Sequence, residues 1–191
     1  MITEPSVIET IGRSSKAFDL ASKLLQDRII FLGDQIMSDN TNSIIMQMLW
    51  LAADSPEEPI SLYINSPGGV IYDGLAIKDI MDDIPCKVNT VGVGMCASMG
   101  AYLLAAGTGT RRVTKNCRIM LHSASSGTKG TIHDMAVDFN ETKYMNDKLL
   151  EDIVSFSCGK LTEELLNKAT QRDHYMNPEE AINMGIIDAV V

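Results

Sequence analysis

The sequence contains few aromatic residues and no run of lysine or arginine. Phe, Trp and Tyr make up 5% of the 191 residues, whereas hydrophobic residues make up 45%. A core of Leu, Ile, Val, Met and Ala is therefore expected, in a single domain spanning residues 1–191. The net charge is −9. Because nucleic acids and anionic membranes bind basic surfaces, neither is expected as a partner.

The chain also lacks the spacing patterns of metal sites and disulfide frameworks. No Cys-x-x-Cys pair and no paired histidine accompanies its cysteines, Cys86, Cys96, Cys117 and Cys158, so no metal is expected. Residues 1–10 contain no basic segment followed by an apolar one, which argues against a secretory signal. Glycines and polar residues interrupt the uncharged stretch 88–110, which disfavours a membrane helix. A cytoplasmic protein is predicted.

The uncharged stretch has the pattern of a strand followed by a helix. A β-branched run from Val88 gives way to Ala-Tyr-Leu-Leu-Ala-Ala, which favours helix, and Ser98 falls on the turn between Gly94 and Gly100. A helix N-terminus there favours the negative charge of a tetrahedral intermediate. The spacing Gly-x-x-x-Ser-x-Gly differs from the Gly-x-Ser-x-Gly elbow of α/β-hydrolases. Taken alone, Ser98 is more simply explained as a helix N-cap.

Three other positions carry polar groups at strand ends or in loops. A strand over 60–64 leads into Asn65-Ser-Pro-Gly-Gly69 and a helix over 70–81. Adjacent glycines can aim N–H groups outward as in an oxyanion hole, although an ordinary Pro-Gly turn has the same sequence. His122 ends a predicted strand over 118–122. Asp173 lies in a polar loop, where a lone aspartate is usually solvated.

The remaining elements follow from periodicity and capping signals. Residues 1–13 lack periodicity and are interpreted as a mobile arm, after which Ser14-Ser15 is expected to cap a short helix. A helix of about 132–156 is unusually long for one domain, so it is expected to project toward another subunit. Further helices are predicted over 40–53, after Thr162 and after Asn177, with strands over 28–33 and 186–191.

Four segments, in this order, resemble the ClpP family of proteolytic subunits of the Clp serine protease. They are Ser61–Gly69, Gly94–Gly107, Arg118–His122 and Arg172–Asp188. The resemblance extends over essentially the whole chain. It implies an α/β fold, the crotonase-like spiral of β-β-α units with a projecting long handle helix.

The resemblance also implies roles for the residues at the turns. Ser98, His122 and Asp173 correspond to nucleophile, general base and orienting carboxylate, and the N–H groups of Gly69 and Met99 to the oxyanion hole. Such a chain is an endopeptidase that uses no metal and no cofactor of its own. ATP is consumed by a hexameric AAA+ unfoldase, which feeds unfolded proteins into a chamber formed by heptameric rings stacked in pairs.

The sequence departs from this family at three places. Ser123-Ala124 stands where Gln-Pro is usual, which alters the wall of the substrate groove. Asp83 replaces an aromatic residue of the apolar pocket that grips unfoldase loops, and a buried carboxylate there is costly unless paired or exposed. Gln171 replaces an acid that pairs with the following arginine, Arg172, across the ring–ring contact.

Other assignments remain open on the sequence alone. Cys96 is an alternative nucleophile, although a small buried cysteine more often serves packing, and His174 or His133 is an alternative base. The runner-up function is a weakly active or non-catalytic ring subunit that assembles with an active paralogue. A third is a crotonase-type acyl-CoA enzyme, for which no CoA site is discernible.

Overall fold

A seven-stranded, mostly parallel sheet is the central element of the computed structural model, which describes residues 5–11 and 14–191. Five strands follow one another across it in this order: β3 (Ile29–Leu32), β4 (Ile60–Ser66), β5 (Val88–Ala97), β6 (Arg111–Val113) and β9 (Ala189–Val190). Two more strands, β7 (Arg118–Leu121) and β8 (His174–Met176), extend it beside the end of β5. The predicted α/β class is confirmed, although β6 and β8 were not predicted as strands.

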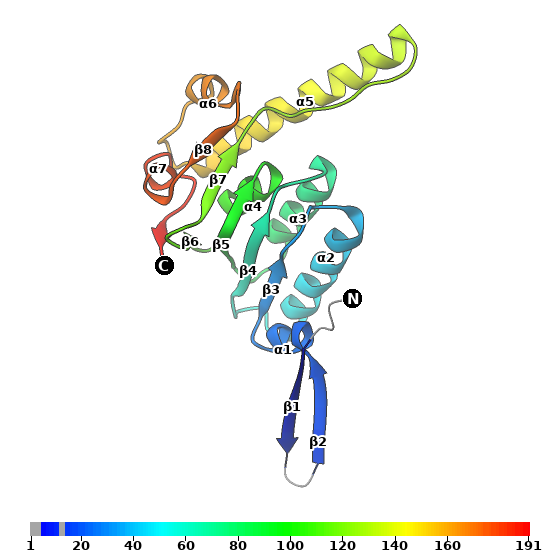
Figure 1. Ribbon diagram of the computed structural model, residues 1–191, viewed down its shortest axis with the longest axis vertical. Helices are drawn as coiled ribbons and strands as arrows, with labels where there is room; N and C mark the ends of the chain where they lie inside the picture. Colours follow the sequence, from blue (N-terminus) through cyan, green and yellow to red (C-terminus); the bar gives the residue numbers. More distant parts are fainter. Residues whose placement is uncertain (1–4, 12–13) are drawn as a thin grey trace.

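The sheet packs against helices that follow its strands. Along β4 the alternate residues Ile60, Leu62 and Ile64 are fully buried, as expected for a strand whose side chains alternate between two faces. Helices α2 (Ser38–Asp54) and α3 (Ile71–Asp83) lie side by side next to the β3–β4 half of the sheet (Figure 1). Every residue of α4 (Met99–Ala105) is buried, so the helix after Ser98 is anchored inside the core.

The long helix α5 (Ile132–Phe156) projects beyond the sheet, with residue limits that match the prediction (Figure 1). Its N-terminus carries a capping box, in which Thr131 and Asp134 bond each other's backbone N–H groups. Large apolar side chains on its outer part are exposed, including Ile132, Val137 and Phe139. Helices α6 (Glu163–Thr170) and α7 (Pro178–Asn183) are capped as predicted by Thr162 and Asn177.

The N-terminal segment differs from the prediction. Instead of an arm and a helix after Ser14-Ser15, β1 (Ser6–Ile11) and β2 (Ser14–Asp19) form an antiparallel hairpin that extends away from the sheet (Figure 1). Residues 1–4 and 12–13 lie outside the described part. Helix α1 (Leu20–Gln26) begins later, because Asp19 is the N-cap and its carboxylate accepts from the Ser22 N–H at 2.7 Å.

The N-terminal segment forms a hairpin, in place of the predicted arm and helix, for a physical reason. The segment is rich in β-branched residues, among them Val7, Ile8 and Thr10, and strand pairing satisfies backbone groups that an isolated arm leaves to water. Pairing of Val7 with Phe18 places an aromatic residue opposite a β-branched one, a favourable cross-strand combination. Phe18 therefore belongs to the hairpin and not to the helix that was expected to follow Ser14-Ser15.

Within residues 5–11 and 14–191 no helix is long and apolar enough to cross a membrane. In the same ranges no group of three or more His, Cys, Asp and Glu side chains is arranged to hold a metal ion.

Candidate active site

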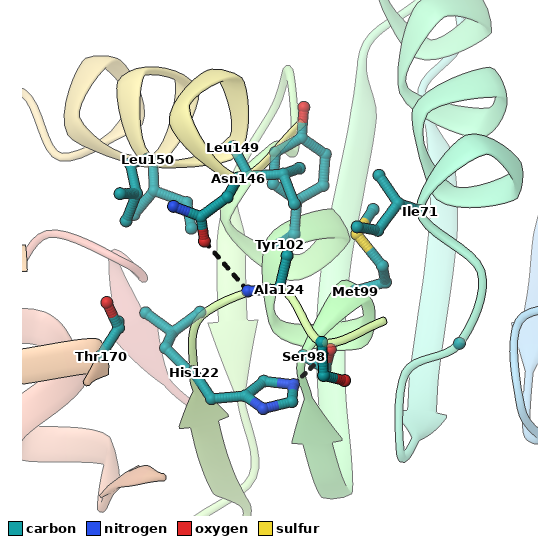
Figure 2. A pocket seen from close by; sticks show the side chains of 14 residues that line it. Ile71, Ser98, Met99, Tyr102, His122, Ala124, Asn146, Leu149, Leu150 and Thr170 are labelled. Atoms are coloured by element: carbon teal, nitrogen blue, oxygen red, sulfur yellow. Dashed lines mark hydrogen bonds between the residues drawn. The ribbon is translucent and has the colours of Figure 1, made fainter. Parts of the chain in front are cut away.

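Two neighbouring parallel strands bring Ser98 and His122 together. Ser98 follows β5 and His122 follows β7, and these strands pair in parallel with Ala97 opposite Met120. The carboxyl ends of parallel strands meet at one edge of a sheet, so residues 24 positions apart become neighbours. The Ser98 Oγ lies 2.9 Å from the His122 Nε2, and Figure 2 shows the two side chains facing one another.

The backbone of Ser98 has a conformation that non-glycine residues rarely adopt. Its φ is 53° and its ψ is −123°, at the junction of β5 and α4. Bonds at both ends hold it there, since the Ser98 N–H donates to the Met120 carbonyl and the Tyr102 N–H donates to the Ser98 carbonyl. Although Ser98 occupies the N-cap position, its hydroxyl makes no capping hydrogen bond. Strain of this kind clusters at functional sites, and here it turns the hydroxyl toward His122.

The Pro-Gly-Gly turn after β4 lies directly against Ser98. A Cβ on Gly68, whose φ is +97°, would lie 2.6 Å from the Ser98 Cβ and 2.7 Å from the Ala97 carbonyl oxygen. Gly69 forms a bridge with Ile36 that uses the Gly68 carbonyl and the Val70 N–H. The N–H of Gly69 itself therefore stays outside that bridge.

A second N–H group near Ser98 belongs to Met99, the first residue of α4. The first N–H groups of a helix have no carbonyl partner within it. Gly69 and Met99 both line the cavity that also contains Ser98 and His122. Two residues from separate turns, Gly69 and Met99, thus border the same cavity as Ser98.

Asp173 is near His122 without a hydrogen bond to it. The antiparallel pairing of β7 with β8 sets Leu121 opposite His174. His122 follows Leu121 and Asp173 precedes His174, so these two residues are also close. The Asp173 Oδ1 lies 3.8 Å from the His122 Nδ1, and the Asp173 side chain is 59% exposed. This separation exceeds hydrogen-bond length, so the third member of the predicted triad is close by but not engaged.

An apolar cavity opens beside Ser98, between α4 and the inner part of α5 (Figure 2). Its apolar walls come from four elements or their flanks and comprise Ile71, Met99, Tyr102, Leu121, Leu149, Leu150 and Ile153. Asn146, Ala124, Ser125 and Thr170 complete it. Burial raises the pKa of the Tyr102 hydroxyl, and its hydrogen bond to Asp152 at 2.7 Å acts in the same direction. Tyr102 therefore stays neutral.

The alternative catalytic residues are placed less favourably. Cys96 is fully buried and its thiol donates to the Ile64 carbonyl. A hydrogen bond with Cys117, together with burial, raises the pKa of Cys96, so its thiol is not activated. His133 is exposed on the first turn of α5, and His174 belongs to β8. The histidine that lines the cavity around Ser98 is His122.

The three departures from the family pattern are all visible. Asp83 ends α3 with its side chain exposed, so it does not carry the cost of a buried carboxylate. Gln171 and Arg172 are exposed as well. Ala124 and Ser125 form part of the cavity wall, and the sequence had already linked Ser123-Ala124 to the wall of the substrate groove.

Comparison with known proteins agrees with this architecture over nearly the whole chain. Residues 12–191 match the family described as Clp protease. The chain is 46% identical to the ATP-dependent Clp protease proteolytic subunit 2 of Synechococcus sp. (strain CC9605), over 98% of this chain and 94% of the relative. It is 43% identical to the ATP-dependent Clp protease proteolytic subunit of Deinococcus radiodurans, over 98% and 91%.

The chain is similar to peptidase subunits along almost its full length. It belongs to the Clp protease family, as a relative of its proteolytic subunits, and its fold is the crotonase-like one of that family.

Proposed function

We propose that this chain is the proteolytic subunit of an ATP-dependent Clp protease and acts as a serine endopeptidase. The observation that carries the proposal is the 2.9 Å separation of the Ser98 Oγ from the His122 Nε2. A serine hydroxyl needs a base within this distance to become a nucleophile. The strained backbone of Ser98 and the apolar cavity beside it support the same role.

The reaction begins when the Ser98 oxygen attacks the carbonyl carbon of a peptide bond and its proton passes to the His122 Nε2. The N–H groups of Gly69 and Met99 stabilise the oxyanion of the tetrahedral intermediate. His122 then gives the proton to the leaving amine, and an acyl-enzyme forms. Water, deprotonated by His122, then attacks the ester carbonyl carbon. The bond to the Ser98 oxygen breaks, that oxygen takes the proton back from His122, and the second product leaves as a carboxylic acid.

Asp173 orients His122 and stabilises its charged form in this scheme. A hydrogen bond with the His122 Nδ1 requires the carboxylate to approach from the present 3.8 Å. Asp173 is exposed and lies in a short segment between α6 and β8. We therefore infer that the triad closes when this segment is held by substrate or by a neighbouring subunit.

The cavity beside Ser98 receives the substrate side chain that precedes the cleaved bond. Its apolar walls favour a large hydrophobic residue, because burying such a side chain is worth about 1.5–3 kcal/mol. Substrates are unfolded protein chains, since an extended segment must enter the cleft. The proposed reaction uses no metal and no cofactor in this chain.

Assembly and partners follow from the family and the shape of the chain. The relatives are named ATP-dependent, which supports a partner AAA+ unfoldase hexamer that consumes the ATP. The exposed apolar side chains of α5 support contact with another subunit, in a heptamer or a stacked double ring. The net charge of −9 fits a cytoplasmic protein without nucleic acid or membrane partners.

A fluorophosphonate probe tests the serine assignment directly. Such a probe reacts with an activated serine, so the wild type should be labelled at Ser98 and the Ser98→Ala variant should not. Mapping the labelled peptide by mass spectrometry identifies the site. Absence of labelling in the assembled wild type would contradict the proposal and favour a non-catalytic subunit or an acyl-CoA enzyme.

A second function is favoured by the open triad and by Gln171. In this alternative the chain is weakly active by itself and reaches full activity in a ring with a paralogous subunit. Labelling that appears only after the paralogue is added would favour it over a self-sufficient peptidase.

A further inference from the structure

The two residues after His122 are attached to two different helices. Ser123 donates from both its N–H and its hydroxyl to the Thr170 carbonyl at the end of α6, at 2.9 Å and 3.0 Å. The N–H of Ala124 donates to the Asn146 Oδ1 of α5, at 3.0 Å. The first attachment uses a backbone carbonyl, and the second depends on one side chain.

Asn146 is the polar side chain of α5 that lines the cavity beside Ser98. Figure 2 shows its oxygen directed at the Ala124 nitrogen, across the space above Ser98 and His122. Its neighbours one turn along the helix, Leu149 and Leu150, belong to the apolar wall. Asn146 therefore joins the two sides of the cavity, the helix on one side and the segment after His122 on the other.

We propose that Asn146 is a positioning residue for substrate binding. Its amide oxygen holds the backbone of Ala124, and so the wall formed by Ala124 and Ser125, at the distance from α5 that a substrate side chain requires. This inference rests on the proposed peptidase function. It adds that α5 sets the width of the binding site through a single side-chain hydrogen bond.

The bond should affect binding more than chemistry. The Asn146 side chain bonds to Ala124 of the cavity wall, whereas the 2.9 Å contact between the Ser98 hydroxyl and the His122 ring is set by the pairing of β5 with β7. Loss of an interaction that is equally strong before and during reaction raises KM and leaves kcat unchanged. A neutral hydrogen bond of this kind corresponds to about a 3- to 10-fold change in KM.

The test compares peptide hydrolysis by Asn146→Ala, Asn146→Asp and the wild type in the assembled protein. Asn146→Ala should raise KM about 3- to 10-fold with kcat within about twofold. Asn146→Asp keeps an acceptor oxygen at this position and should restore a KM close to the wild type. Asn140→Ala is the matched control, because Asn140 is exposed on the same helix and outside the cavity lining; its KM should not change.

A double-mutant cycle tests the partner of Asn146. Proline has no N–H, so Ala124→Pro removes the donor, while Ala124→Gly keeps it. Ala124→Pro should raise KM as much as Asn146→Ala, Ala124→Gly should not, and the double variant should be no worse than either single variant. If Asn146→Ala does not fold, the comparison of Ala124→Pro with Ala124→Gly decides the question.

Two results would overturn the inference. One is a KM for Asn146→Ala equal to that of the wild type. The other is a loss confined to kcat, which would place the effect on His122 and not on the wall. Fluorophosphonate labelling of Ser98 separates these failures from a failure of the peptidase proposal, since labelling should persist in Asn146→Ala and be absent throughout if the enzyme is not a serine peptidase.

Discussion

Asp173 is the residue whose role depends most on a small displacement. Its carboxylate lies 3.8 Å from the His122 Nδ1, and closing that gap is proposed to orient the imidazole. We expect Asp173→Asn to fold normally and to lower kcat by about 10⁴, because the amide favours the wrong tautomer of the histidine. Circular dichroism checks the fold, and a fluorogenic peptide measures the rate. Wild-type turnover in this variant would exclude Asp173 from the mechanism.

Gly68 should be as sensitive as the catalytic residues although it supplies no side chain. A methyl group there would collide with the Ser98 Cβ at 2.6 Å, and the φ of +97° is unfavourable for alanine. We expect Gly68→Ala to lose fluorophosphonate labelling and about 1–3 kcal/mol of stability. Gly127→Ala is the control, since a Cβ at Gly127 would meet nothing within 4 Å; equal labelling of both variants would contradict the steric argument.

At the scale of elements, one buried arginine connects several of them. Arg111 of β6 donates to the carbonyls of Ala105, Phe156 and Gly185, which end or follow α4, α5 and α7. It also pairs with Asp188 before β9, at 2.6 Å. Arg111 thus ties the C-terminal ends of these helices to the sheet.

Removing this guanidinium should destabilise the whole domain. Arg111→Met would leave buried carbonyl groups without donors and Asp188 without its cation, at a cost of about 3–5 kcal/mol. Chemical denaturation measures the loss. Arg118→Met is the control, because Arg118 is exposed and should change stability little. A similar effect of both substitutions would show that the network is not the cause.

The ion pair of Arg111 with Asp188 should make the unfolding free energy depend on pH. Partial burial raises the pKa of Asp188, but the hydrogen bonds and charge of Arg111 outweigh it and hold the pKa below its ordinary value. A carboxyl whose pKa is lowered on folding stabilises the protein above its unfolded pKa of about 4, and loses that effect as the pH falls through the folded value. The wild type should therefore exceed Asp188→Asn in unfolding free energy at pH 7, with the difference shrinking toward pH 3. A constant difference would contradict this assignment.

At the scale of the whole molecule, the exposed pair Gln171 and Arg172 bears on assembly. In related rings an acid at the position of Gln171 is expected to pair, across the ring–ring contact, with the arginine at the position of Arg172. The amide keeps a neutral hydrogen bond but not the charge-assisted one, a loss of about 1 kcal/mol per contact. Because the segment also carries Asp173, assembly and triad closure should be coupled.

We therefore expect Gln171→Asp, or a paralogue that carries the acid, to shift the protein from single toward stacked rings and to raise its peptidase rate. Sedimentation velocity measures ring size, and the peptide assay measures rate on the same samples. The expectation is wrong if the wild type is already a fully active double ring and neither Gln171→Asp nor the added paralogue changes its size or its rate.

We expect Asp83 to weaken the contact between a ring of this chain and an unfoldase. Its side chain is exposed at the end of α3, where an aromatic residue is usual in the family, and apolar anchors dominate most interfaces. A ring made only of this chain should bind an unfoldase weakly, and Asp83→Phe should strengthen binding. Tight binding by the wild type, unchanged in the variant, would contradict this prediction.

Much of the fold was predictable because its signals are local. The helix of about 132–156, the caps Thr162 and Asn177, and the strands before Ser98 and His122 follow from periodicity, capping chemistry and glycines within a few residues. The hairpin of β1 and β2 was missed because its stabilisation comes from pairing, as between Val7 and Phe18. The short strands β6 and β8 have too few residues to show a period.

Residue types and their spacing identified the chemical groups at the turns, namely Ser98 before a helix, His122 after a strand, and glycines after β4. The folded chain adds that Ser98 and His122 lie 2.9 Å apart, that the Ser98 hydroxyl makes no capping hydrogen bond, and that Asn146 bonds to Ala124. Local sequence governs the conformation of a segment. Distances between segments depend on strand register and helix packing, which are set by the core as a whole and by residues far apart in the chain.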